Sequence, residues 1–291
     1  MVKVRIAIGA ALIAGLLLTI WADEKLGGPY FASVLILIPT LMGQDELVRM
    51  MRGRRPGFWI IVQSTAVLTI GAALVDRIFR WTDHPTEIDL FAIVFGLSVV
   101  LAQKVFAFER GTREDVNDHL ADVACAALSL LYVLAPMALL QFLTFMPPAG
   151  YEGQGTRFAC AVVLISKCGD IGGYLVGTFA GKRRILPRVS PKKSYEGSIG
   201  GLALTIAAVF LLAPQFPWLS DGVGVLGKLV FAVVINLSTQ AGDFAESMLK
   251  RTCGVKDSAA VLPTFGGALD IIDSLVFAVP AAFFLFRLAG A

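Results

Sequence analysis

The sequence predicts an all-α membrane protein that crosses the bilayer many times. Three observations lead to this fold class. Of the 291 residues, 56% are apolar and only 16% are charged, whereas a soluble domain carries about 25% charged residues. Apolar segments that approach the roughly 20 residues of a membrane helix recur along the whole chain. The basic residues, finally, gather in alternate connections between these segments.

The apolar segments predict about nine transmembrane helices. The second and seventh segments are short, so a re-entrant segment is an alternative for each. The first segment ends at Trp21, where a cleaved signal peptide would need small residues, and we therefore expect a retained helix. The nine segments cover residues 4–21, 29–43, 57–75, 90–107, 120–146, 158–180, 199–213, 225–246 and 269–288.

The distribution of Lys and Arg predicts the orientation of the chain. Of the 25 basic residues, 18 lie in five alternate connections and six lie in the opposite ones. Because cytoplasmic loops retain positive charge, we expect the N-terminus in the cytoplasm and the C-terminus outside. The polar loops 181–198 and 247–270 then share the cytoplasmic face, where their charges can form one site.

Histidine and cysteine chemistry has little support in the sequence. The only histidines, His84 and His119, are too few for a histidine metal site or a histidine-centred triad. The cysteines lie in or beside apolar segments without paired spacing, and we interpret them as free thiols in a reducing context. They are Cys125, Cys160, Cys168 and Cys253.

Charged residues are concentrated around the last connection of the chain. Their spacing predicts that those on the eighth segment share one helix face, at i, i+4, i+7 and i+8. The two carboxylates that open the ninth segment, at i and i+3, share another face. Between them, Gly266 and Gly267 allow the backbone to approach a ligand closely. The set comprises Asp243, Ser247, Lys250, Arg251, Lys256, Asp257, Asp270 and Asp273.

This mixture of charges indicates a phosphate ligand. Charged side chains within a membrane segment are costly, so they usually pair or line a wet cavity. Carboxylates bind Mg²⁺, and Lys and Arg bind phosphate oxygens. The residues therefore favour transfer at a phosphorus atom, with a nucleotide or polyphosphate as one substrate. A solvated basic loop with ion pairs and a pathway for ions or solutes are the alternatives.

A second polar constellation occupies residues 166–201. Its glycines recur every four residues and leave one helix face without side chains, against which another helix can pack closely. Lys167 and Asp170 could form an internal ion pair or belong to the site. The run Lys182–Arg184 is typical of a topology signal that contacts lipid headgroups, whereas for Lys192 and Lys193 we favour a substrate phosphate. The glycines are Gly169, Gly173, Gly177 and Gly181.

Residues 247–273 resemble the signature of the phosphatidate cytidylyltransferase (CDP-diacylglycerol synthase) family. That pattern is roughly Ser-x-x-Lys-Arg, four residues, Lys-Asp, then Pro-x-His-Gly-Gly, two residues and Asp-Arg-x-Asp. The resemblance extends over roughly residues 166–275 and is specific, because many polar positions match in register. They are Ser247, Lys250, Arg251, Lys256, Asp257, Pro263, Gly266, Gly267, Asp270 and Asp273, with Asp170, Gly172, Tyr174, Gly177, Ser190–Ser194, Glu196 and Gly197 upstream.

Three positions depart from the family pattern. Phe265 stands where the family has His, and Ile271 stands where it has Arg. Ala268 replaces a larger apolar residue. The loss of a cation and a polar ring could alter substrate binding, catalytic rate or the choice of lipid acceptor.

The resemblance implies a transfer of a cytidylyl group from CTP to phosphatidate, giving CDP-diacylglycerol and pyrophosphate for phospholipid synthesis. It implies Mg²⁺ as cofactor, bound by Asp243, Asp270 and Asp273, and a homodimer in the bacterial inner membrane. Lys250, Arg251 and Lys256 would contact the triphosphate, and Ser247 a phosphate oxygen. Lys192 and Lys193 could hold the phosphatidate headgroup. Residues 1–150 would form an N-terminal region of about five helices, and residues 151–291 the catalytic region.

Other functions remain open from the sequence alone. A CTP-dependent polyprenol kinase or a CDP-archaeol-type synthase would use a similar architecture on another lipid. A secondary transporter would bind an ion at Lys167, Asp170 and Asp243, although the two halves contain no visible repeat. A non-catalytic scaffold would not explain aspartates held in register, and nothing in the sequence indicates nucleic-acid binding.

Overall fold

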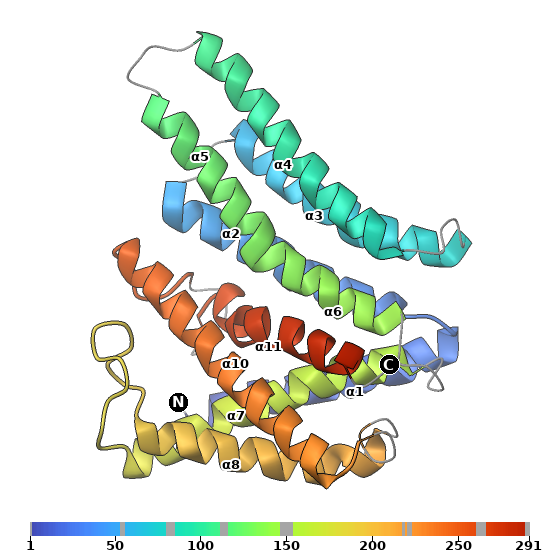
Figure 1. Ribbon diagram of the computed structural model, residues 1–291, viewed down its shortest axis with the longest axis vertical. Helices are drawn as coiled ribbons and strands as arrows, with labels where there is room; N and C mark the ends of the chain where they lie inside the picture. Colours follow the sequence, from blue (N-terminus) through green and yellow to red (C-terminus); the bar gives the residue numbers. More distant parts are fainter. Residues whose placement is uncertain are drawn as a thin grey trace.

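Each expected apolar segment coincides with a helix of the protein (Figure 1). The computed structural model describes residues 2–52, 56–79, 85–110, 116–145, 154–216, 219, 223–259 and 266–288. Within these residues, an isolated bridge joins Arg184 and Ser194. The elements are α1 (Val2–Leu26), α2 (Tyr30–Arg52), α3 (Pro56–Phe79), α4 (Pro85–Arg110), α5 (Val116–Leu128), the π-helix η2 (Ser129–Leu134), α6 (Ala135–Phe145), α7 (Gly155–Ala180), α8 (Tyr195–Leu212), the 3₁₀ helix η3 (Ala213–Gln215), α10 (Val225–Thr252) and α11 (Leu269–Leu288).

The predicted all-α membrane fold is confirmed. Six helical segments of the described chain are long and apolar enough to cross a membrane: α2, the rod from α5 to α6, α7, α8 with η3, α10 and α11. Shorter apolar stretches, Trp59–Val75 and Ala92–Phe106, lie in α3 and α4. The expected number of about nine spans is therefore only approximate.

Helix α2 is longer than the sequence predicts. The apolar segment was expected to end at residue 43, yet the helix has 23 residues and continues to Arg52. It continues because its polar side chains find partners: Asp45 accepts a hydrogen bond from Trp59 Nε1 at 2.8 Å and pairs with Arg49 one turn later. At this length α2 can span a bilayer, and the re-entrant alternative is not needed.

Helix α11 lies in the centre of the C-terminal region. It packs against α2, α6, α7 and α10, so its flanks are enclosed by helices from both halves of the sequence (Figure 1). Ile165 of α7, Ile235 of α10 and Ile272 of α11 are almost completely buried in the shared apolar core. The polar residues at the start of α11 are thereby held at a fixed place between these helices.

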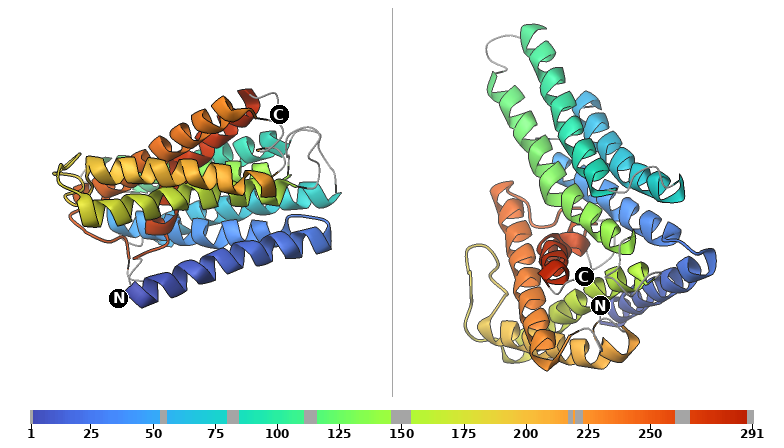
Figure 2. Two further views of the ribbon diagram at one scale, coloured as in Figure 1. Left: turned by 90° about the horizontal axis from the view of Figure 1, so that it is seen from below. Right: turned by 45° about the vertical axis from the view of Figure 1, so that its right-hand side comes forward.

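The two polar loops lie at the same end of the molecule. The connection between α7 and α8 and the segment that follows α10 emerge at the end where the N-terminus lies, and the C-terminus lies at the opposite end (Figure 2, left). Lys193 of the first loop contacts Asp243 of α10, four residues before the second loop begins.

The glycine stripe of α7 makes a close contact with α8, as predicted. A side chain on Gly201 of α8 would place its Cβ 2.8 Å from the Gly169 carbonyl oxygen, and one on Gly197 would lie 2.8 Å from the Gly173 carbonyl oxygen. The two backbones therefore meet almost directly. Such contact stabilises membrane helices through packing, because lipid supplies no hydrophobic drive for helix association.

We expect Gly201→Ala to destabilise the protein. Ala normally stabilises a helix by about 0.5–1 kcal/mol relative to Gly, but here the added methyl group would press on the backbone of α7 and cost about 1–3 kcal/mol. The control is Gly71→Ala in α3, where a Cβ meets nothing within 4 Å. The midpoint of thermal unfolding in detergent should fall for the first variant and not for the second. An equal response of both variants would contradict the contact.

Candidate active site

The loop between α7 and α8 is held in one conformation by its own hydrogen bonds. The Arg184 guanidinium donates to the Lys192 carbonyl oxygen at 2.6 Å. The Glu196 carboxylate, at the start of α8, accepts from the backbone N–H groups of Lys182 at 3.0 Å and Arg183 at 3.2 Å. This anchoring directs Lys193 inward, where its Nζ lies 2.5 Å from Asp243 Oδ2.

A first group of charged side chains surrounds Asp243, and we call it the Asp243 cluster. It joins α7, the α7–α8 loop, α10 and α11. Lys167 Nζ lies 3.1 Å from Asp170 Oδ2 and donates to Ser274 Oγ at 2.6 Å, so the two residues form an ion pair, which does not decide whether they also belong to the site. The cluster consists of Lys167, Asp170, Lys193, Asp243, Asp273 and Ser274.

The carboxylates of the Asp243 cluster act on one another electrostatically. Asp243, Lys167 and Asp170 are charged neighbours of the buried Asp273. Asp170, in turn, interacts with Asp243 and with Lys193. The cluster therefore concentrates three carboxylates and two ammonium groups from four parts of the chain, inside segments that are otherwise apolar.

A second group surrounds Asp270, and we call it the Asp270 cluster. Lys250 Nζ lies 2.5 Å from Asp270 Oδ1 and 2.7 Å from Glu246 Oε2. The other oxygen of Asp270 accepts from the Gly267 N–H at 2.7 Å and lies 2.8 Å from Ser258 Oγ, whose single O–H is shared between Asp270 and Glu46. The cluster consists of Glu46, Glu246, Lys250, Ser258 and Asp270.

The two clusters adjoin at Glu246 and Tyr132. Glu246 is an electrostatic neighbour of Asp273 as well as of Asp270. Tyr132 belongs to the π-helix η2, a rare element that occurs frequently at functional sites. Asp273, Glu246 and Asp243 are its charged neighbours, and its buried hydroxyl has no hydrogen-bond partner within the described residues. The polar region therefore extends from the α7–α8 loop to the start of α11.

The structure brings together only part of the predicted site. Asp243, Asp273 and Lys193 meet in one cluster and Lys250 and Asp270 in the other, so the two clusters divide the predicted metal ligands. Ser247 is partly buried on α10. The remaining predicted phosphate ligands are exposed at the same end of the molecule: Lys192, Arg251 and Lys256. Pro263 and Phe265 lie outside the described residues, and Ile271 is half-buried in α11.

The sequence analysis missed several members of the two clusters. Glu246 has a detectable signal, because it lies three residues after Asp243 and four before Lys250 on one helix face. Ser258 and Ser274 lie inside or next to the matched motif. Glu46 and Tyr132 lie far away in the sequence, and no local pattern indicates their contacts.

The carboxylates suit a magnesium ion that is shared with a substrate. Among the described residues, no three Asp, Glu, His or Cys side chains converge to form a complete metal cage. Mg²⁺ seldom needs one, since it is usually bound through one or two carboxylates together with water and substrate phosphates. The neighbouring carboxylates of Asp243 and Asp273 fit that pattern. Asp270 is engaged by Lys250, Ser258 and Gly267.

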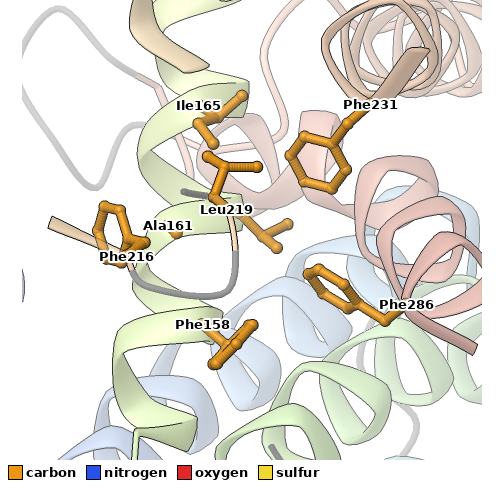
Figure 3. Close-up of a pocket in the computed structure, with 8 residues that line it drawn as sticks. Phe158, Ala161, Ile165, Phe216, Leu219, Phe231 and Phe286 are labelled. Carbon is orange, nitrogen blue, oxygen red and sulfur yellow. The ribbon is translucent and has the colours of Figure 1, made fainter. Parts of the chain in front are cut away.

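An apolar pocket lies at the other end of the same helices (Figure 3). Its walls come from the start of α7, from α10 and from the end of α11, and they include Phe158, Phe231 and Phe286. All of its lining side chains are apolar. It has no group that could bind a phosphate or a metal ion, so the chemistry belongs to the polar clusters.

Comparison with known proteins decides between the functions that the clusters allow. The sequence pattern of the cytidylyltransferase family matches residues 3–289, almost the entire chain. The chain belongs to the cytidylyltransferase family. Membership covers both halves of the chain, including the N-terminal helices, where the sequence analysis found only hydropathy.

Individual relatives of this cytidylyltransferase are similar over most of their length. It is 30% identical to a phosphatidate cytidylyltransferase of Pseudomonas aeruginosa, over 89% of this chain and 96% of that protein. It is 30% identical to one of Thermotoga maritima, over 86% and 85%. A phosphatidate cytidylyltransferase of Mycobacterium tuberculosis is 29% identical over 99% of this chain and 81% of its own.

Family membership makes the protein a nucleotidyltransferase enzyme. It decides against the two alternative functions, a secondary transporter and a non-catalytic scaffold. It also does not favour a polyprenol kinase, because a kinase transfers the terminal phosphoryl group of a nucleotide rather than its nucleotidyl group.

Proposed function

We propose that the protein transfers the cytidylyl group of CTP to phosphatidate and so forms CDP-diacylglycerol for phospholipid synthesis. The family match over residues 3–289 carries this proposal. Two clusters of charged side chains beside apolar helices support it, because one substrate is a membrane lipid and the other comes from water. The reacting groups must meet near the surface of the bilayer.

In this reaction a phosphate oxygen of phosphatidate attacks the α-phosphorus of CTP. The bond between that phosphorus and the oxygen bridging to the β-phosphate breaks, and pyrophosphate leaves with the bonding electrons. A phosphate monoester is already an anion at neutral pH, so the site needs no strong general base. Its task is to bring two polyanions together in line, which it can achieve by positioning and electrostatic stabilisation.

The lysines of the two clusters are the groups that would bind these anions. Lys167 lies on α7, Lys193 on the loop that follows it and Lys250 on α10, so phosphates could be contacted by lysines from three parts of the chain. The exposed Lys192, Arg251 and Lys256 lie at the same end of the molecule and would attract the nucleotide from the water. Ser247 would donate a hydrogen bond to a phosphate oxygen.

Asp243 and Asp273 are the residues that we propose to hold Mg²⁺, with Asp270 as a further carboxylate that acts from the second cluster. When bound, Mg²⁺ would neutralise charge on the phosphates and stabilise the attacking and leaving oxygens. The observation that supports this choice is the electrostatic proximity of Asp243 to the buried Asp273.

We also propose that the clusters face the cytoplasm of a bacterial inner membrane, with the N-terminus on the same side and the C-terminus outside. The asymmetry of Lys and Arg supports this orientation. A homodimer is a further proposal, which rests on the family resemblance. Cysteine labelling in intact cells and the mass of the protein in detergent would test these two points.

Removal of divalent metal should abolish the activity reversibly. Purified protein supplied with CTP and phosphatidate should form CDP-diacylglycerol and pyrophosphate, and excess EDTA should stop the reaction, because without a metal ion the carboxylates of Asp243 and Asp273 would repel the phosphates. Added MgCl₂ should restore the rate. The product is measured by thin-layer chromatography of labelled lipid. An absence of product with MgCl₂ present would overturn the proposed reaction, and activity that persists in EDTA would overturn the metal dependence.

A further inference from the structure

The hydrogen bonds of the Glu46 side chain connect α2 to the loop after α10 and to the start of α11. Its side chain is buried, with 4% exposure. Oε1 accepts from the Ala268 N–H at 2.8 Å, and Oε2 accepts from the Leu269 N–H at 2.9 Å and lies 2.8 Å from Ser258 Oγ. A residue of the N-terminal half thus satisfies the first backbone donors of α11, more than 200 positions later in the chain.

Glu46 replaces a cap that the local sequence cannot supply. A helix N-terminus is usually capped by a Ser, Thr, Asp or Asn just before its first turn. Gly266, Gly267 and Ala268 precede α11, and none of them has a capping side chain. The dipole of α11 favours a negative charge at this place, and the buried Glu46 carboxylate provides it.

The bonds of Glu46 continue to the charged residues of the site. Ser258 Oγ contacts both Glu46 Oε2 and Asp270 Oδ2, each at 2.8 Å. Asp270 in turn holds Lys250. The chain Glu46–Ser258–Asp270–Lys250 therefore links α2, the loop after α10, α11 and α10.

The two glycines before α11 are required by this arrangement. Gly266 has φ +90°, a conformation that side chains disfavour. A Cβ on Gly267 would collide with the Glu46 carboxylate and the Ser258 hydroxyl. The close approach of α2 thus explains the Gly-Gly pair, which the sequence analysis had related only to a ligand.

We propose that Glu46 is a positioning residue of the active site, which fixes Ser258 and the start of α11 so that Asp270 and Lys250 keep their places. This inference rests on the proposed function, and it gives α2 a role in catalysis without contact to the substrate. Because Glu46 and Asp270 already occupy the backbone donors at the start of α11, the nucleotide phosphates are bound by the lysines instead.

The test compares Glu46→Gln with Asp45→Asn. Both variants remove one negative charge from adjacent positions of α2, but Asp45 contacts Arg49 and Trp59 rather than the site. Glutamine offers one acceptor oxygen in place of two, and its NH₂ group would face a donor. We expect kcat to fall about 10–100-fold in Glu46→Gln and the Kd for CTP to rise, while Asp45→Asn stays near the wild type.

Ser258→Ala distinguishes positioning from a purely structural cap. If Glu46 acts through Ser258, Ser258→Ala alone lowers kcat, and the double variant Glu46→Gln/Ser258→Ala is hardly worse than the poorer single variant. If Glu46 only stabilises α11, Ser258→Ala keeps wild-type kcat and Kd, and Glu46→Gln lowers only the midpoint of thermal unfolding. The second pattern would overturn the inference.

Equilibrium binding of labelled CTP separates this inference from the proposed reaction. If the wild type forms no CDP-diacylglycerol yet binds CTP, the proposed reaction fails, and the Kd values of the same variants still decide the role of Glu46. Unchanged Kd values in Glu46→Gln would then refute it.

Discussion

Asp243→Asn should lower the rate of CDP-diacylglycerol formation by about 10²–10³-fold, the cost typical of losing one electrostatic contact to a transition state. The Asp243 carboxylate holds Lys193 at 2.5 Å and is a charged neighbour of Asp273. Asparagine keeps the shape of the side chain but removes its charge, so both the proposed metal ligand and the partner of Lys193 are lost. Initial rates at saturating CTP and MgCl₂ measure the effect.

The control for Asp243→Asn is Glu24→Gln. Glu24 pairs with Arg157 through exposed side chains at 2.5 Å, at the end of the molecule opposite to the polar loops. The Glu24→Gln variant loses one negative charge, as Asp243→Asn does, but Glu24 contacts neither cluster. Exposed ion pairs contribute little to stability, so the protein should stay folded. Wild-type activity in Asp243→Asn would contradict the assignment of Asp243, and strong loss in Glu24→Gln would reveal a general effect of charge.

Lys250→Met should abolish activity and also destabilise the protein. The Lys250 side chain is only 11% exposed and pairs with two carboxylates, those of Glu246 and Asp270. Removing one partner of a buried ion pair costs about 3–5 kcal/mol, because the charge that remains has no compensation. The midpoint of thermal unfolding and the rate of product formation would be measured on the same preparation.

A second variant separates the two effects of Lys250→Met. Lys250→Met/Glu246→Gln also removes one of the stranded charges, so we expect it to unfold at a higher temperature than Lys250→Met alone. Its activity should remain lost, since the cation that would bind phosphate is still absent. Recovery of activity together with stability would mean that Lys250 has only a structural role.

The fold could be predicted from the sequence because lipid as a solvent imposes a strong rule. Apolar segments of membrane length must be helical, and each of them coincides with a helix. The residues at which the helices begin and end could be predicted less well, as α2 illustrates. Hydropathy stops at residue 43, but the helix continues to Arg52 since Asp45 and Glu46 are satisfied by partners elsewhere in the chain. Such partners depend on tertiary packing.

The candidate site could be predicted in its residue types but not in its arrangement. Helical spacing places Asp243 and Lys250 on one face of α10, and this is correct. The same spacing cannot say that Asp243 meets Lys193 whereas Lys250 meets Asp270. Glu46 and Tyr132 were out of reach, since the contacts that bring them to the site span more than 100 residues.

The lysines within the clusters already have carboxylate partners: Lys167 pairs with Asp170, Lys193 with Asp243, and Lys250 with Glu246 and Asp270. A phosphate that binds one of these lysines displaces the carboxylate paired with it. A metal ion that binds one of the carboxylates likewise displaces its lysine. Either exchange alone would leave a stranded charge in surroundings of low polarity. Nucleotide and metal ion should therefore assist each other's entry, each raising the other's affinity by the same factor. Without its ligands, the site keeps its lysines paired with its own carboxylates, and it favours the joint binding of an anion and a cation.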